Sequence, residues 1–226
     1  MTGNFVIAVS GLRLEARIAA RYIGVKAVAG GGDTARLDKL VRQLAAQGGA
    51  AILSFGIAAG LEPGCSAGGC LVGREVVYGD SSYSANPAWT ASIQKQIGYA
   101  GLVTIAGVDQ PLACASEKQA LHQASGAAAA DMESHVVARI AAELFLPFAV
   151  LRVVCDPAER ELPPAVIAGM RADGTMDVSA VLGSLARSPG QLPGLIRLAV
   201  EAGRARATLF RCSDLLGPRL GFRDLS

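Results

Sequence analysis

The sequence predicts an α/β fold of three layers, in which helices cover both faces of a mainly parallel, mixed central sheet. Two observations predict it: short apolar runs, as in strands buried on both faces, and amphipathic segments of helical period that alternate with those runs. Hydrophobic residues make up 51% of the chain and charged residues 18%, which excludes an ordinary disordered protein. The 226 residues suit one domain, so residues 1–226 are expected to fold as a single unit.

Strands are expected wherever a short apolar run stands between turn signals, and the most apolar run is FAVLRVVC. The predicted strands are residues 4–9, 25–29, 51–55, 71–78, 101–108 and 147–155. Residues 56–60 (GIAAG) follow the third strand and are expected to form a Gly-rich turn. They match neither G-x-G-x-x-G nor the P-loop pattern, so they indicate only that the backbone approaches something closely.

Helices are expected where apolar and polar residues recur with helical period. Asp33 stands where its side chain can cap the second helix, after three glycines that break the preceding strand. The predicted helices are residues 12–22, 34–47, 88–97, 116–123, 134–145, 162–168, 178–186 and 192–210. The last helix carries several arginines, which are most simply a solvated face. Basic amphipathic helices can also lie on anionic lipid, so contact with a membrane surface stays open.

Charge and cysteine content narrow the class of protein. The formal net charge of +2 gives no electrostatic argument for binding nucleic acid. Five scattered cysteines do not suit a disulfide framework, and no paired histidines accompany Cys65 and Cys70, so no metal site is expected. The N-terminus lacks the pattern of a signal peptide, and no stretch reaches the roughly 18 apolar residues of a membrane span. The cytoplasm is therefore the expected location.

Asp156 directly follows the most apolar strand. In open α/β sheets ligands bind beyond the carboxyl ends of strands, so this carboxyl group is expected at a ligand site. Burial there would raise its pKa, which suits a general acid near neutral pH. The alternative is a helix N-cap, because Pro157 follows and proline favours the first helical turn. The sequence alone leaves both interpretations open.

Other carboxylates lie near predicted helix starts. Residues 131–133 (DME) precede a helix, where carboxylates often only complement the helix dipole, although Glu133 could instead bind sugar hydroxyls. Glu15 lies beside Arg13 and Arg17 on the first helix, where surface ion pairs are the usual outcome. Neither histidine accompanies a Ser or Cys in a recognisable catalytic context, which excludes a hydrolytic triad.

Four stretches between residues 6 and 156 form an ordered pattern. They are the first strand and turn (residues 6–15), SFGIAAGL (54–61), DMES (131–134) and LRVVCD (151–156). In this order they resemble the nucleoside phosphorylase and methylthioadenosine/S-adenosylhomocysteine nucleosidase superfamily, whose GxAGGL turn, EMEx motif and VRxxSD strand end they look like. The resemblance implies a nucleoside phosphorylase-like fold and cleavage of the N-glycosidic bond of a purine nucleoside.

The resemblance also assigns roles. Asp156 would protonate, or hydrogen-bond to, N7 of the leaving purine, while Glu133 would hold the ribose hydroxyls and Met132 would pack on the ribose. Glu15 matches, within one position, the carboxylate that activates water in the nucleosidases. The other expected substrate contacts are Gly56, Val108, Asp109 and Gln110, the last three facing the base. The family needs no metal or organic cofactor, with phosphate as a co-substrate in some members, and commonly forms homo-oligomers that complete the pocket.

The second half of the chain looks like the hopanoid-associated phosphorylases. The likeness lies in Leu162-Pro163-Pro164, a turn at residues 171–174 and SPGQLP at residues 188–193. That subfamily is linked to removing adenine from adenosylhopane, a nucleoside with a bulky triterpenoid at its 5′ carbon. The apolar segment 162–170 would suit a hydrophobic entrance for such a substrate, although a dimer interface would explain it equally well.

Three positions depart from the family pattern. Cys155 replaces the usual serine before the aspartate, Ile57 stands where many phosphorylases have a phosphate-binding serine, and Ser54 stands where some have an arginine. Arg13 and Arg17 are the candidates to bind phosphate instead, so water and phosphate both stay open as the nucleophile. A methylthioadenosine/S-adenosylhomocysteine-type nucleosidase and a non-catalytic nucleoside-binding protein are the alternatives. A dinucleotide-dependent oxidoreductase would need a Gly-rich fingerprint after the first strand, which is missing.

Overall fold

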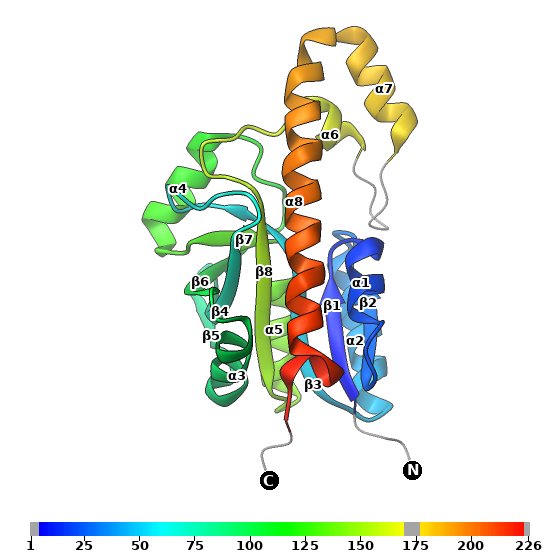
Figure 1. The fold of residues 1–226 in the computed structure, drawn as a ribbon, viewed down its shortest axis with the longest axis vertical. Coiled ribbons are helices and arrows are strands. Elements are labelled where there is room, and N and C mark those ends of the chain that lie inside the picture. Colours follow the sequence, from blue (N-terminus) through cyan, green and yellow to red (C-terminus); the bar gives the residue numbers. More distant parts are fainter. Residues whose placement is uncertain (1–4, 170–176, 224–226) are drawn as a thin grey trace.

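The computed structural model describes residues 5–169 and 177–223 of the chain (Figure 1). Its strands are β1 (Phe5–Ser10), β2 (Val25–Ala29), β3 (Gly49–Gly60), β4 (Cys70–Tyr78), β5 (Ser81–Ser84), β6 (Gly101–Gly107), β7 (Ala129–Asp131) and β8 (Phe148–Asp156). Its helices are α1 (Arg13–Ala19), α2 (Thr34–Ala46), α3 (Pro87–Ile97), α4 (Ala115–Ser125), α5 (Ser134–Glu143), α6 (Pro164–Gly169), α7 (Val178–Arg187) and α8 (Leu192–Leu216). Every expected helix forms, with shifted ends, whereas the turn expected at 171–174 lies outside the described residues.

The strands form one mixed sheet, which confirms the predicted fold class. Their order is β2-β1-β3-β7-β6-β4-β5, and β8 pairs with both β3 and β4. Five pairings are parallel and three are antiparallel. The strands β3, β7, β6, β4 and β8 pair in turn and return to β3, so this part of the sheet closes on itself.

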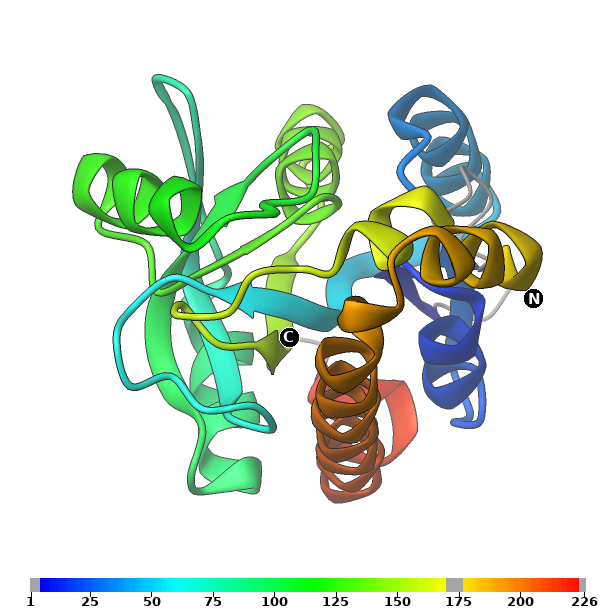
Figure 2. The ribbon, with the colours of Figure 1, turned by 90° about the horizontal axis from the view of Figure 1, so that it is seen from above.

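Helices cover the sheet on two sides because its strands are apolar on both faces. In β1, Val6 and Ala8 belong to a core cluster with α1, α3 and α8, whereas Ile7 and Val9 belong to a cluster with α2 and α5. This alternation follows from the two-residue period of a strand. The single tryptophan, Trp89, is buried in the first cluster. Figure 2 shows α1 and α8 on one side of the sheet and α2 and α5 on the other.

The Gly-rich segment 56–60 does not form the expected turn. It is the second half of β3, which runs without a break from Gly49 to Gly60. Small side chains allow this half to pair with β8 on one side as far as Ala59, which lies opposite Asp156, and with β7 on the other at Ala59 and Gly60. Strand β5 was not expected either, because SSYS carries no apolar run and forms only through pairing with β4.

The long helix α8 extends beyond the carboxyl ends of β1, β3 and β8, where α6 and α7 lie against its first turns (Figure 1). This arrangement places α6 and the upper part of α8 over the edge of the sheet where Asp156 lies. Within residues 5–169 and 177–223, no helix is long and apolar enough to cross a lipid bilayer.

Candidate functional site

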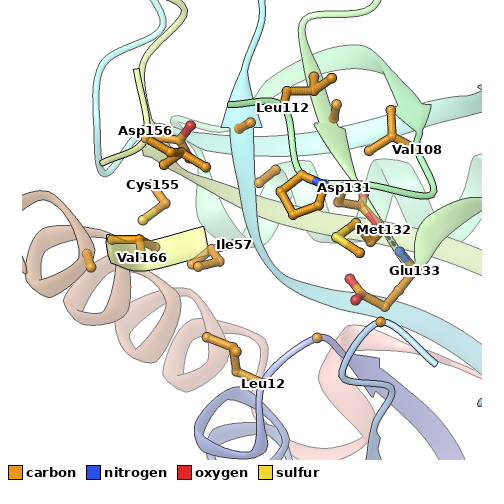
Figure 3. Close-up of a pocket in the computed structure, with 18 of the residues that line it drawn as sticks. Leu12, Ile57, Val108, Leu112, Asp131, Met132, Glu133, Cys155, Asp156 and Val166 are labelled. Carbon is orange, nitrogen blue, oxygen red and sulfur yellow. Dashed lines mark hydrogen bonds between the residues drawn. The ribbon is translucent and has the colours of Figure 1, made fainter. Parts of the chain in front are cut away.

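A pocket of about 330 Å³ opens where several strands end (Figure 3). Residues that end or follow β1, β2, β6, β7 and β8 line it, together with the second half of β3. Its apolar wall comes mainly from Leu12, Leu112, Leu162, Val166 and Leu198. The carboxylate side chains that line it are Glu15, Asp131, Glu133 and Asp156. The pocket therefore combines a large apolar surface with a few buried acids, as small-molecule sites commonly do.

Glu15 lies inside this pocket and not in a surface ion-pair ladder. It is only 4% exposed, because the start of α1 turns its side chain toward β3. Its carboxylate accepts hydrogen bonds from the backbone N–H groups of Leu12, at 3.0 Å, and Ile57, at 3.1 Å. Burial raises the pKa of Glu15, while the backbone donors and the charge of Arg152 oppose that rise.

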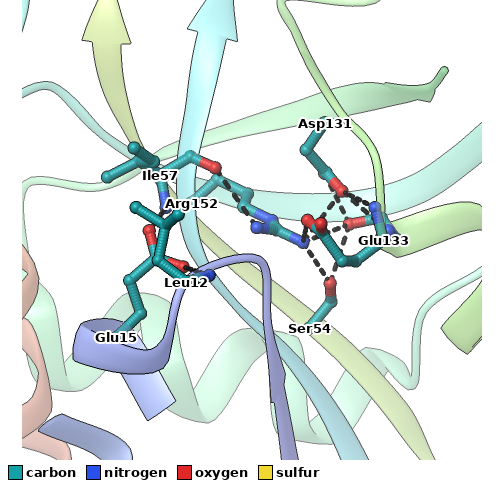
Figure 4. A network of polar contacts seen from close by, with 8 residues as sticks. Leu12, Glu15, Ser54, Ile57, Asp131, Glu133 and Arg152 are labelled. Carbon is teal, nitrogen blue, oxygen red and sulfur yellow. Dashed lines mark hydrogen bonds and ion pairs between the residues drawn. The ribbon is translucent and has the colours of Figure 1, made fainter. Parts of the chain in front are cut away.

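Arg152 is the centre of the polar network beneath the pocket (Figure 4). Its guanidinium is fully buried and donates to Asp131 Oδ1 at 2.8 Å, to Ser54 Oγ at 2.6 Å and to the carbonyl of Ile57 at 3.2 Å. The Nη2 atom, which donates to Asp131 and Ser54, also lies 3.6 Å from Glu133 Oε2. Arg152 thus offsets the charge of several carboxylates that would otherwise be costly to bury together.

Sequence reasoning assigned no role to Arg152, although a signal was present. It is the single charged residue inside the most apolar strand, FAVLRVVC. A fully buried arginine must be paired, so its position predicts buried acids on neighbouring elements. Ser54, which the family resemblance aligns with an arginine of some phosphorylases, is one of its partners.

Asp131 and Glu133 differ in what their side chains contact. Asp131 accepts hydrogen bonds from the backbone N–H groups of Glu133, at 2.9 Å, and Ser134, at 2.7 Å, and so satisfies two backbone donors at the start of α5. Glu133 makes no side-chain cap bond and instead lines the pocket beside Met132. Burial raises the pKa of Glu133 to about 8, against the attraction of Arg152 and with repulsion from Asp131 and Glu15.

Asp156 is the last residue of β8 and not a helix cap, because the next helix begins only at Pro164. It is 7% exposed and lines the pocket on a different side from Glu133 (Figure 3). Its Oδ2 atom accepts from the ammonium group of Lys118 at 2.5 Å. Burial raises the pKa of Asp156, whereas Lys118 opposes that rise. No sequence signal marked Lys118, which lies among polar residues on α4.

The residue before Asp156 also lines the pocket. Cys155 is 7% exposed, and burial together with nearby carboxylates raises the pKa of its thiol to about 12. The thiol is therefore neutral at physiological pH and adds no charge to the site. Within the described part of the chain, no group of His, Cys, Asp or Glu side chains is placed to hold a metal ion.

Several expected site residues do not line the pocket. Asp109 and Gln110 are exposed, and the Asp109 carboxylate accepts from Tyr78 Oη at 2.7 Å and lies 3.4 Å from His135 Nε2. The Tyr78 ring stacks on His135 at 4.3 Å, so Asp109 belongs to this cluster outside the pocket. Of the three expected residues 108–110 only Val108 lines the pocket, together with Pro111 and Leu112 further along the loop.

The remaining expected residues surround the site without lining it. Arg13 and Arg17 are exposed on α1. Gly56 lies beneath the pocket, where an added Cβ atom would sit 2.7 Å from Glu15 Oε2 and 2.9 Å from Arg152 Nη1. The close approach expected at the Gly-rich segment is therefore an approach to the buried acid–arginine network.

Comparison with solved structures gives the same fold. The 5′-methylthioadenosine/S-adenosylhomocysteine nucleosidase of Helicobacter pylori, with butyl-thio-DADMe-Immucillin-A, matches with a TM-score of 0.65 and 15% identity over 93% of this chain and 98% of that one. The futalosine hydrolase of the same organism matches with a TM-score of 0.64 and 14% identity over 94% and 99%. The S-adenosylhomocysteine nucleosidase of Streptococcus pyogenes, with 5-methylthiotubericidin, matches with a TM-score of 0.63 and 14% identity over 93% and 96%.

At these identities the structural likeness shows the fold alone, and no curated protein sequence matches the chain. A family model provides the sequence-level link. The model of the Phosphorylase superfamily matches residues 34–187, which include the Gly-rich half of β3, the segment 131–133 and the end of β8. Because this match covers more than half of the chain, the protein belongs to the Phosphorylase superfamily.

Proposed function

We propose that this chain hydrolyses the N-glycosidic bond of a purine nucleoside, with adenine as the leaving base. One observation carries the proposal: a single pocket holds Asp156 on one side and the pair Glu15 and Glu133 on another, all three nearly fully buried. Cleavage of this bond needs an acid at the base and negative charge near the sugar as it becomes oxocarbenium-like. A structural neighbour with 5′-methylthioadenosine in its active site supports a purine nucleoside as the ligand.

In this proposal each side of the pocket has its own task. Asp156 donates a proton to N7 of the base, and its burial keeps the pKa raised for that purpose. Glu133 accepts hydrogen bonds from the ribose hydroxyls, while Met132 packs against the sugar and Val108 lies toward the base. These carboxyl groups are held in place before the cationic sugar forms, so they stabilise it without reorganisation, which is the usual source of electrostatic catalysis.

We propose water as the nucleophile rather than phosphate. Among the described lining residues none is Lys or Arg, and Arg13 and Arg17 lie outside the pocket. A phosphate dianion would meet the carboxyl groups of Glu15 and Glu133, which offer it no positive charge, and it would repel either of them when that group is ionised. Glu15, held by two backbone donors and with a raised pKa, is suited to take a proton from the attacking water.

The 5′ substituent in this proposal is bulky and apolar, as in adenosylhopane. The supporting observation is the apolar wall, where Leu162 and Val166 face Leu198 and Ala202 of α8 around the same pocket. The same two helices, α6 and α8, also expose the apolar side chains of Ile167, Ile196 and Val200. A small 5′ group, as in methylthioadenosine, would leave much of that surface in contact with water, at an expected cost of about 25 cal/mol per Å².

The test measures adenine release by chromatography, with and without phosphate, from adenosine carrying a bulky apolar 5′ group and from methylthioadenosine. We expect equal release with and without phosphate, a higher kcat/KM for the apolar substrate, and loss of turnover in Asp156→Asn and Glu133→Gln. Asp109→Asn is the matched control, since Asp109 lies outside the pocket. Release only with phosphate would exclude hydrolysis. No release from either substrate, with substrate affinity kept in Asp156→Asn, would favour a nucleoside-binding protein.

A further inference from the structure

Lys118 is the one lysine that the described part of the chain buries completely. Its ammonium group, on α4, donates to Asp156 Oδ2 at 2.5 Å and to the backbone carbonyls of Pro157 and Arg160, each at 3.0 Å. Each of the three N–H donors of the ammonium group therefore has an oxygen acceptor. Lysine is almost never fully buried without such partners, because the desolvation of its charge is costly.

The geometry points to Lys118 as a positioning residue for bond cleavage, which stabilises the carboxylate that Asp156 becomes when it gives its proton to the leaving purine. This inference rests on the proposed function. Lys118 does not line the pocket, whereas Asp156 does, so the lysine acts on the base only through the aspartate. One carboxylate oxygen is held by the ammonium group, and the carboxyl group faces the pocket from that fixed position.

The proton and electron balance is simple. The C1′–N9 bond breaks and its electron pair stays on the base, while the carboxyl proton of Asp156 moves to N7. A carboxylate is left opposite the Lys118 ammonium, which keeps its three protons throughout. Water adds to C1′ and gives a proton to Glu15. Between turnovers Glu15 releases its proton to solvent, and solvent returns a proton to Asp156.

The titratable groups that face Asp156 come from three elements. Lys118 approaches from α4, and Glu201 approaches from α8, where Arg160 pairs with it at 3.3 Å. Cys155 adjoins on β8 with a neutral thiol. Lys118 lowers the pKa of Asp156, and Glu201 raises it. Removal of the lysine charge therefore raises this pKa and leaves the newly formed carboxylate without its cation.

A purely structural role is the competing explanation, since Lys118 also orders the turn at Pro157 and Arg160. Two readouts separate the roles. Activity on a purine nucleoside falls as pH rises through the pKa of Asp156, because the acid must carry its proton. A structural role would lower kcat without shifting the pH at which activity falls, which is the basic limb of the pH–rate profile. A leaving group that needs no proton, such as nitrophenolate, would not depend on the pair.

The experiment compares Lys118→Met with wild type on an adenine nucleoside and on a nitrophenyl riboside with the same 5′ group. We expect kcat for the nucleoside to fall about 10- to 100-fold, the factor that a hydrogen bond to a charged group contributes. The basic limb of the pH profile is expected to move to higher pH, and the nucleoside-to-riboside rate ratio to fall. Lys95→Met, at an exposed lysine of α3, is the matched control. Equal losses on both substrates with an unmoved limb would overturn the inference.

If Lys118→Met folds poorly, Lys118→Gln replaces it in the same measurements. A double-mutant cycle with Asp156→Asn gives a second test. In the Asp156→Asn background, loss of Lys118 is expected to change the nucleoside rate less than twofold, since no carboxylate forms there. Additive losses would assign Lys118 a structural role only. If the wild-type chain releases no adenine, the proposed function fails. If the wild type is active and Lys118→Met matches it, the inference alone fails.

Discussion

Replacement of Arg152 by Met tests the central claim about the site, that one cation makes its buried acids compatible with the fold. The substitution keeps a side chain of similar length and removes the guanidinium from Asp131, Ser54 and Ile57. Asp131, Glu133 and Glu15 would then share a buried region without that compensating charge. Removing one partner of a buried ion pair in this way lowers the free energy of unfolding by about 3–5 kcal/mol.

That cost translates into a large fall in melting temperature. For a chain of this size, about 1 kcal/mol shifts Tm by roughly 2–4 °C, so Arg152→Met is expected to lower Tm by about 6–20 °C. Arg139→Met is the matched control within the same chain. Arg139 pairs with Asp38 at 2.7 Å and Glu143 at 2.9 Å, but 44% of its side chain is exposed. Exposed pairs contribute about 0–1 kcal/mol, so Tm should fall by at most about 4 °C.

The assay is thermal unfolding of wild type, Arg152→Met and Arg139→Met at pH 5 and pH 8. At pH 5 Glu133 and Glu15 of the variant, whose pKa values burial raises and Arg152 no longer lowers, bind protons and lose their uncompensated charge. The gap between Arg152→Met and wild type should therefore narrow at pH 5 and widen at pH 8. Equal melting of the two arginine variants, or a gap that does not change with pH, would refute the role given to Arg152.

Three further predictions concern the same site. Glu133 has a pKa raised from 4.5 to about 8, so its contribution to stability is present below pH 4.5 and is lost as pH rises toward 8; Tm should fall over this range in wild type and less in Glu133→Gln. Gly56→Ala should lower the free energy of unfolding by about 1–3 kcal/mol, because its methyl group would lie 2.7 Å from Glu15 Oε2. The control Gly183→Ala, on α7 and with no neighbour within 4 Å, should keep or raise Tm. Asp109→Asn should change KM less than twofold, and a larger change would place this loop at the substrate.

The sequence by itself determined the layers of the fold, because the alternation of apolar runs and amphipathic segments has one stable arrangement with helices on both faces of a sheet. It also made Asp156 a candidate, because this residue stands at the end of the most apolar strand, whereas Glu133 was singled out by the family resemblance. The sequence also predicted the helix cap at Asp33. Its carboxylate accepts a hydrogen bond from the backbone N–H of Arg36 at 2.9 Å and caps the start of α2.

Only the tertiary structure decided the rest, because those features depend on pairings between distant segments. Residues 56–60 extend β3 instead of turning, since β7 and β8 offer pairing partners that the local sequence does not reveal. Glu15 is buried because α1 packs its start against β3, while Arg13 and Arg17 remain outside. Lys118 meets Asp156 across 38 residues of sequence, and the contact exists only because α4 packs beside the end of β8. Burial and pairing of a charge are properties of the whole fold, and a sequence window that contains one partner cannot show them.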